Sequence, residues 1–253
     1  TGFPAKVPSI MLPIGISFYT FQLITYCVDV YRGDARPQRS FKMLLLYVSL
    51  FHQCIAGPIV RYKDICAELE ERRASQFDIA EGINRFTVGL AKKAIIANTC
   101  AALADTLLVP DGGDFSLLAS KSVLSLWVGV LAFTLQIYID FSAYSDMAIG
   151  MGKMIGIHYT ENFDYPYIST SVSEFWRRWH ITLGSFFRDY LYIPLGGSRC
   201  GKVRTVLNLL LYGHLRGFGM ALRGILCCGG FISSCLLRWK SSSFQNILKS
   251  SRL

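Results

Sequence analysis

Three long stretches without a charged residue set the pattern of this chain. They run from Val7 to Val28, from Met43 to Val60 and from Ser122 to Ile139, and charged residues flank each of them. Each is close to the ~20 residues that an α-helix needs to cross the hydrocarbon core of a bilayer. The pattern predicts an all-α, polytopic membrane protein with transmembrane helices at these three positions.

The second run contains a break. It includes Ala56-Gly57-Pro58, through which a regular helix does not continue. One interpretation is a kinked or re-entrant segment near His52 and Gln53, where protein or a cavity covers the irregular backbone. The other is an ordinary helix that ends at Gly57, and the residues favour neither.

The region after the second run is more polar. Residues Lys63 to Gln76 carry many charges and predict a solvated helix or loop. Phe77 to Leu108 follows a helical pattern, with Lys92-Lys93 at its centre. These lysines either extend to the membrane interface or separate two helices.

Composition agrees with a membrane protein. Hydrophobic residues make up 52% of the chain, charged residues 17%, and the mean hydropathy is +0.36, whereas a soluble domain carries about 25% charge. The net charge is +9, but no basic stripe interleaved with stacking aromatics lies outside the apolar runs. We therefore expect the lipid bilayer as a partner and no nucleic acid. The eight cysteines lack the spacing of metal ligands, so we expect no metal. We also expect no bound cofactor.

The stretch from Ser171 to Arg199 concentrates aromatic and basic residues. Read as one helix that begins at Ser171 or Ser173, it carries a broad apolar stripe with spacings of three and four. The stripe consists of Phe175, Trp176, Trp179, Leu183, Phe186 and Phe187.

His180 lies beside this stripe. Desolvation and the nearby Arg177 and Arg178 both oppose a charged imidazole, and a neutral imidazole can take a proton from a hydroxyl as a general base. The alternative is an interfacial helix whose tryptophans anchor it and whose arginines contact headgroups. This stretch by itself favours the alternative.

Two aspartates, Asp140 and Asp146, lie in an otherwise apolar and small-residue context after the third run. Ionisable groups at membrane depth are candidates for function. They could instead cap short helices beside the interface, together with Ser142 and Ser145.

Five segments, taken in order, resemble the membrane-bound O-acyltransferase family. They are LPIGISFYTFQ, AGPIVRY, QIYIDFSAYSDMAIG, ENFDYPY and EFWRRWHITLGSFFRDYLYIPLGG. The resemblance covers Pro8 to about Leu211, and the branch it resembles is that of bacterial alginate O-acetyltransferases. The D-alanyl transfer proteins of teichoic acid synthesis share the FRDY element, but the IPLGG ending at Ile193 to Gly197 favours the branch that acetylates polysaccharides.

This resemblance implies a multi-helix fold with a central funnel, in which the histidine of the RRWH motif, His180, is an active-site residue. It also implies an acyl donor such as acetyl-CoA as substrate, an exported polysaccharide such as alginate as acceptor, an extracytoplasmic acyltransferase partner, and a place in the bacterial inner membrane. The residues expected to line the substrate or donor site are Trp176, Arg177, Arg178, Trp179 and Asp189, with Asp140 and Asp146 as further candidates.

Three alternatives stay open. The chain could transfer D-alanyl or another acyl group to a cell-envelope polymer. Asp140, Asp146 and the break at Ala56-Gly57-Pro58 suggest a transporter, although the two related halves typical of transporters are not visible. A scaffold of a secretion complex would not need His180 for its role.

The resemblance stops after Leu211. The family continues into a Trp-His-Gly segment with the second active-site histidine, which is missing here. A shifted reading frame takes the third base of one residue's codon and the first two bases of the next. From Gly217 onward, this frame permits Phe-Trp-His-Gly, and the shifted codon formed by Met220 and Ala221 can encode only glycine. We therefore predict a core fragment at residues 1–211 and an out-of-frame tail at residues 212–253, in preference to a divergent C-terminus.

Two further expectations concern the polypeptide as written. It lacks the second histidine, so we expect it to be inactive. It begins at Thr1 without a methionine, so we expect a preceding N-terminal part.

Overall fold

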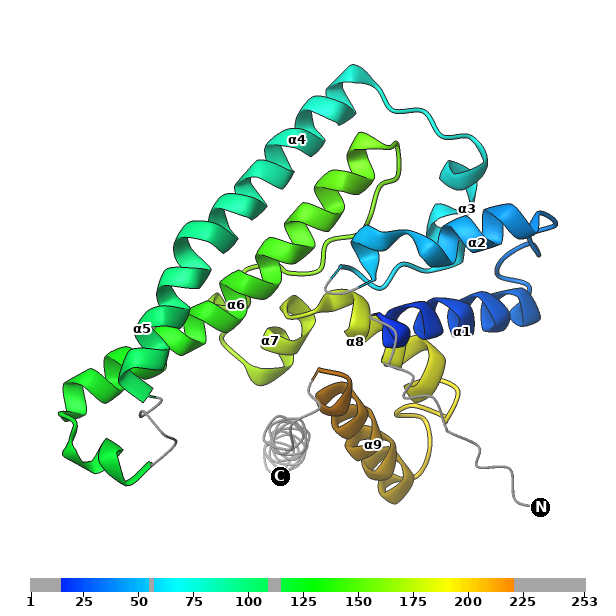
Figure 1. The fold of residues 1–253 in the computed structure, drawn as a ribbon. Coiled ribbons are helices and arrows are strands. Elements are labelled where there is room, and N and C mark those ends of the chain that lie inside the picture. Colours follow the sequence, from blue (N-terminus) through cyan, green and yellow to red (C-terminus); the bar gives the residue numbers. More distant parts are fainter. Residues whose placement is uncertain (1–14, 55–56, 109–114, 221–253) are drawn as a thin grey trace, which may run out of the picture.

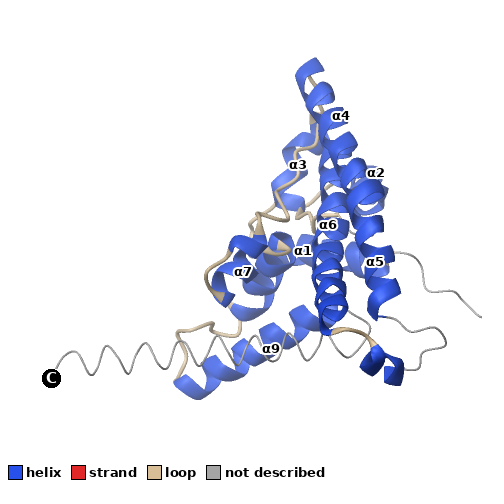
Figure 2. Ribbon diagram, turned by 90° about the vertical axis from the view of Figure 1, so that its left-hand side faces the viewer, coloured by secondary structure: helices blue, strands red, loops and turns tan. Residues whose placement is uncertain are grey.

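The computed structural model describes residues 15–54, 57–108 and 115–220, and every regular element in these residues is helical (Figures 1 and 2). The α-helices are α1 (Ile16–Arg32), α2 (Phe41–Ser49), α3 (Tyr62–Glu70), α4 (Gln76–Ala91), α5 (Asn98–Leu108), α6 (Val123–Met154), α7 (Val172–Arg178), α8 (Ile181–Phe187) and α9 (Lys202–Met220). Short 3₁₀ segments are η1 (Phe51–Gln53), η4 (Phe115–Ser120) and η5 (Pro166–Ile168), and π-helical segments are η2 (Lys92–Ala97) and η6 (Arg188–Tyr192). The prediction of an all-α protein is confirmed.

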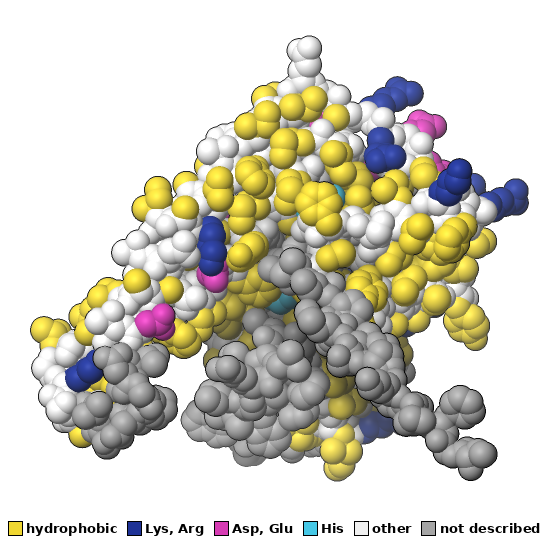
Figure 3. Space-filling model, viewed as in Figure 1, with side chains coloured by type: hydrophobic (Ala, Val, Ile, Leu, Met, Phe, Trp, Pro, Cys, Tyr) yellow, Lys and Arg dark blue, Asp and Glu magenta, His cyan; other side chains and the backbone are white. Residues whose placement is uncertain are grey.

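A long helical hairpin dominates the molecule (Figure 1). Helix α4 continues through η2 into α5 and packs along α6. Gln76–Leu108 and Val123–Met154 are the two helices in the described residues that are long and apolar enough to cross a membrane. Large apolar side chains point outward from them, such as Ile95, Leu124 and Trp127, which are 68%, 74% and 63% exposed. Figure 3 shows hydrophobic side chains over much of this face, as expected of a lipid-facing surface.

The predicted positions of the transmembrane helices need correction. The third run lies in α6, as expected, but the other candidate helix is Gln76–Leu108, which runs through Lys92-Lys93 as one helix, so these lysines do not separate two helices. Helix α2 in the second run ends at Ser49, and 3₁₀ and extended backbone follow it. The interpretation of an ordinary helix that ends at Gly57 is therefore wrong. Of the first run, residues 7–14 lie outside the described residues.

Protein buries much of the second run, although Leu45 and Phe51 are exposed. Tyr47 and Gln53 are fully buried. The Tyr47 hydroxyl donates to the Val60 carbonyl at 2.8 Å, and Gln53 Nε2 donates to the Tyr47 carbonyl at 2.8 Å. These bonds satisfy backbone groups that the broken helix leaves open.

Helix α3 is less solvated than its charges predict. Tyr62, Ile65 and Leu69 form one buried face and join a core with Ile149 and Ile157. The charged residues of this segment occupy the remaining faces. A spacing of three and four residues is that of an amphipathic helix, which the high charge had obscured.

Glycines allow the two arms of the hairpin to approach closely. A Cβ on Gly82 would lie 2.7 Å from the Gly150 carbonyl oxygen, and a Cβ on Gly150 would lie 2.7 Å from that of Gly82. One Cβ on Gly89 would lie 2.8 Å from the Ala143 carbonyl oxygen. Small residues at such crossings let backbones of membrane helices pack together.

The predicted boundary between Leu211 and Tyr212 falls inside α9. Tyr212 packs on Tyr192, with ring centroids 5.9 Å apart. Residues 221–253 of the predicted tail lie outside the described residues. The boundary stays a prediction.

The glycine crossing makes a testable prediction. Gly89→Val should destabilise the protein by about 1–3 kcal/mol, because the added methyl groups meet backbone that cannot move aside. Unfolding in detergent micelles measures this change. Ala91→Val, at an exposed position of the same helix, is the control. Equal stability of the two variants would contradict the close packing.

Candidate active site

The chain breaks its helix at His180. Helix α7 ends at Arg178, Trp179 is extended, and His180 adopts the left-handed conformation with φ 45° and ψ 60°. The prediction of one continuous helix through this stretch is therefore wrong, although Ser171 is the N-cap as expected and accepts a bond from the Glu174 amide at 3.2 Å.

Backbone pairing with the loop after α6 explains the break. The Asp164 amide donates to the Arg178 carbonyl at 3.0 Å, and the Ile181 amide donates to the Asn162 carbonyl at 2.9 Å. These bonds replace those that a continuous helix would have made. A left-handed conformation at a residue other than glycine costs on the order of 1–3 kcal/mol, and such residues cluster at functional sites.

The His180 side chain is buried, with 3% of the residue exposed. Its Nδ1 lies 2.9 Å from Oδ1 of Asn162, which is fully buried. The Phe141 ring contacts the imidazole edge-on at 4.8 Å, and the Phe163 ring stacks at 6.3 Å between centroids. Asn162 was missed as a site residue in the sequence, where ENFDYPY carried the family resemblance but no assigned chemistry.

The tryptophans and arginines around His180 separate into different environments. Trp179 is buried against Phe163 and Phe175, so it is not an interfacial anchor. Trp176 is half-buried against Phe175, and Arg177 is exposed.

Arg178 forms ion pairs with two carboxylates. Its guanidinium lies 3.0 Å from the Glu174 carboxylate and 3.1 Å from that of Asp164. Arg178 therefore fixes the loop after α6 against α7.

A cavity of about 540 Å³ lies next to residues that surround His180, although His180 itself is not among its lining residues. Phe163, which stacks on the imidazole, and Ile181, the next residue in the chain, form part of its wall. The hydroxyl of Ser145, also in the wall, is buried and has no hydrogen-bond partner among the described residues. The other lining residues are Arg85, Lys92, Tyr138, Ser142, Asp146, Glu161, Asp164 and Tyr165.

Both predicted intramembrane aspartates pair with cations across the hairpin. Asp146 lies 2.7 Å from Lys92 Nζ and 2.9 Å from Arg85 Nη2, and Asp140 pairs with Lys93. Asp140 and Asp146 lie in the middle of α6, so the interpretation as caps of short helices is wrong. Pairing lowers the cost of placing these charges at membrane depth.

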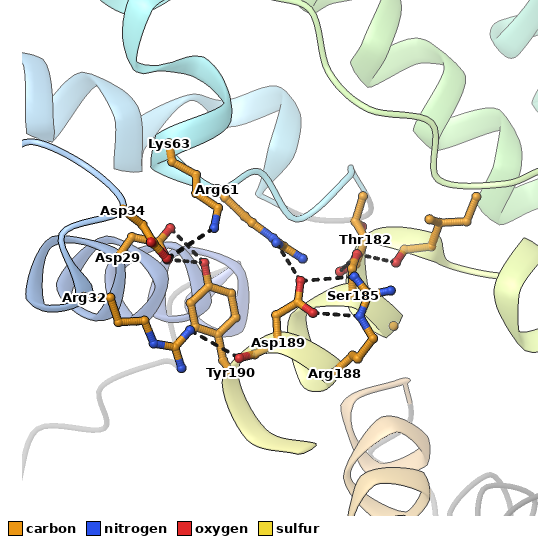
Figure 4. Close-up of polar contacts among 12 residues, drawn as sticks. Asp29, Arg32, Asp34, Arg61, Lys63, Thr182, Ser185, Arg188, Asp189 and Tyr190 are labelled. Carbon is orange, nitrogen blue, oxygen red and sulfur yellow. Dashed lines mark hydrogen bonds and ion pairs between the residues drawn. The ribbon is translucent and has the colours of Figure 1, made fainter. Parts of the chain in front are cut away.

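Asp189 belongs to a second charged cluster that connects α1, the segment before α3 and η6 (Figure 4). Its carboxylate lies 2.9 Å from Arg61 Nη1 and 2.7 Å from Arg188 Nε. Burial opposes ionisation of Asp189, but the hydrogen bond from Arg188 and the charge of Arg61 outweigh it and hold the pKa of the carboxyl below its ordinary value. Nearby, the Tyr190 hydroxyl lies 2.7 Å from an oxygen of the buried Asp29.

Comparison with known proteins identifies the family. Residues 36–212 match the family described as MBOAT, membrane-bound O-acyltransferase family. The chain belongs to this family. It is 48% identical over 211 residues to "Probable alginate O-acetylase AlgI" of Pseudomonas aeruginosa, covering 82% of this chain and 38% of that protein. Membership confirms the expected family and a membrane protein.

More distant relatives act on other polymers, according to their names. The chain is 36% identical to the "Peptidoglycan O-acetyltransferase" of Helicobacter pylori, covering 83% of this chain and 44% of the relative. It is 26% identical to the "Teichoic acid D-alanyltransferase" of Bacillus subtilis, covering 71% and 45%. The chain spans about two-fifths of the length of the alginate O-acetylases that it matches.

The hairpin ion pairs make a prediction about stability. Lys93→Met should destabilise the protein, by less than the roughly 3–5 kcal/mol of a fully buried pair, because it leaves the Asp140 carboxylate without its cation. Adding Asp140→Leu should restore much of the loss.

Unfolding of the two single variants and the double variant in detergent micelles measures the coupling, and Lys42→Met at an exposed position of α2 is the control. A double variant no more stable than Lys93→Met would contradict a pairing role.

Proposed function

We propose that this chain is part of an O-acyltransferase that transfers an acetyl group to an exported polysaccharide such as alginate, with His180 as its general base. The observation that supports this most is the buried His180, held by Asn162 and packed against Phe163, which lines a cavity. Identity of 48% to an alginate O-acetylase, against 26% to a D-alanyltransferase, favours acetyl transfer.

In the proposed reaction, the neutral imidazole takes the proton of an acceptor hydroxyl. The hydroxyl oxygen then attacks the carbonyl carbon of a thioester donor such as acetyl-CoA, and a new ester bond forms. The carbon–sulfur bond breaks, and the thiol leaves with the proton. The low polarity around Phe141 and Phe163 favours an imidazole that is neutral before it accepts a proton.

The candidate lining residues contribute in different ways in this proposal. Asp146 borders the cavity, where Arg85 and Lys92 balance its charge. Trp176, Trp179 and Arg178 shape the surroundings of His180, and the exposed Arg177 is available to a phosphate-bearing donor. Asp140 and Asp189 act through their ion pairs.

The setting completes the proposal. We place the intact protein as a multi-pass protein in the bacterial inner membrane, with an extracytoplasmic acyltransferase as a partner and the polysaccharide as acceptor. The two long apolar helices and the family support the membrane setting.

Substitution of His180 tests the proposed role. His180→Asn should lower polysaccharide acetylation by roughly 10²–10⁴-fold, the contribution of a positioned general base. Asparagine tolerates the left-handed conformation, so this variant removes the imidazole with little added strain.

The assay uses the intact parent protein, because this chain spans two-fifths of its relatives. Arg177→Gln, at a nearby exposed position, is the comparison that distinguishes loss of the base from loss of a donor contact. This variant should weaken binding of the acyl donor and leave the turnover rate at saturating donor unchanged. Acetylation by His180→Asn at the level of the unsubstituted protein would favour a scaffold.

The tail has its own test. We propose that residues 212–253 are read in a shifted frame, which the end of the family match at residue 212 supports. The encoding DNA should contain codons for Trp-His-Gly in the shifted frame, and the polypeptide as written should show no acetyl transfer. Early stop codons in that frame, or activity of this polypeptide, would contradict the proposal.

A further inference from the structure

The carboxamide oxygen of Asn162 accepts hydrogen bonds from two residues. His180 Nδ1 lies 2.9 Å away, the Thr182 hydroxyl 2.9 Å and the Thr182 amide nitrogen 3.3 Å. Asn162, His180 and Thr182 are 0%, 3% and 5% exposed. Water is therefore a poor competitor for these bonds.

The Thr182 amide decides which end of the Asn162 side chain faces the histidine. A backbone N–H can only donate, so the atom opposite it must be the carboxamide oxygen rather than the NH₂ group. That oxygen in turn can only accept. The Nδ1 atom of a neutral His180 must then carry the proton, and Nε2 must carry the lone pair.

A second bond fixes the Thr182 hydroxyl. The Ile59 amide donates to Thr182 Oγ1 at 3.0 Å, which directs the hydroxyl proton toward Asn162. Ile59 lies near the end of the second run, in the extended segment after α2, where it is 4% exposed. Donated hydrogen bonds thus run from the Ile59 amide to Thr182 and from Thr182 to the Asn162 oxygen, which also accepts the bond from the imidazole.

We propose that Asn162 is a positioning residue that holds His180 in the tautomer with its proton on Nδ1, so that Nε2 is the basic nitrogen of the acyl transfer. Thr182 and the Ile59 amide hold Asn162 in the required orientation. This inference rests on the proposed function of His180 as a base.

The chemistry also explains an amide rather than a carboxylate at residue 162. The Asn162 NH₂ group has no hydrogen-bond partner among the described residues, so only the oxygen is used. Aspartate would supply the same acceptor, but its charge would favour the imidazolium form, which cannot accept a proton. Asparagine fixes the tautomer without placing a negative charge beside the imidazole.

The tautomer can be read directly. Solid-state NMR of the intact protein in lipid bilayers, with ¹⁵N-labelled histidine, distinguishes a protonated from an unprotonated ring nitrogen, and His180→Gln assigns the signals. We expect protonated Nδ1 and unprotonated Nε2 in the unsubstituted protein, and loss of this preference in Asn162→Ala. An Nε2-protonated ring in the unsubstituted protein would overturn the inference.

The pH dependence of acetylation tests the role of the amide. Asn162→Asp keeps the acceptor but stabilises the imidazolium, so the rise of activity with pH should move to higher pH. Asn162→Ala should lose activity by up to the roughly 10²–10⁴-fold that a positioned base supplies, at every pH. An unchanged pH profile in Asn162→Asp would count against action through the imidazole.

Ser185, one turn along α8, provides a matched control for the hydroxyl of Thr182. Thr182→Val removes the hydroxyl that orients Asn162 and should reduce activity and the tautomer preference together. Ser185→Ala removes a hydroxyl that donates to the Ile181 carbonyl within the same helix, and should change neither. Equal effects of the two variants would contradict the proposed series of bonds.

The two proposals fail in distinguishable ways. Absence of acetyl transfer by the unsubstituted intact protein would contradict the proposed function. The NMR measurement would still test the proposed tautomer of His180.

Discussion

The buried oxygen of Asn162 connects three parts of the chain that lie far apart in the sequence. Through Thr182 it reaches Ile59 in the extended segment after α2, and through His180 it reaches the break between α7 and α8. Each group that meets it is withdrawn from water, so loss of the acceptor would leave buried donors unsatisfied, at about 1–3 kcal/mol each. The geometry of the candidate site therefore depends on this oxygen.

The hairpin supports that site by a different kind of interaction. Its arms approach through Gly82, Gly89 and Gly150, and lysine and arginine side chains from one arm meet Asp140 and Asp146 of the other. In lipid, apolar side chains gain little from contact with one another, so close backbone packing and paired polar groups hold helices together. The cavity lies between this hairpin, which contributes Arg85, Lys92 and Asp146, and the loop that carries Asn162, which contributes Glu161 and Phe163.

The broken second run links the two regions. A run of apolar residues has the same appearance in a sequence whether lipid or protein covers it. Here protein covers much of it: Tyr47 and Gln53 are buried, and Ile59 and Val60 contact the site and the core. Irregular backbone is tolerated at such a place only because neighbouring segments satisfy its amide and carbonyl groups.

The residues alone determined the helical class, the membrane setting and the family, because apolar runs and the ordered motifs around RRWH are properties of local sequence. They also singled out His180. Only the tertiary structure decided which apolar runs form long helices, that the helix breaks at His180, and that Lys92 and Lys93 face Asp146 and Asp140. It also brought Asn162 and Ile59 to the histidine. A hydrogen bond such as that between Ile59 and Thr182, which lie 123 positions apart, has no signature in local spacing, since it depends on how the helices pack.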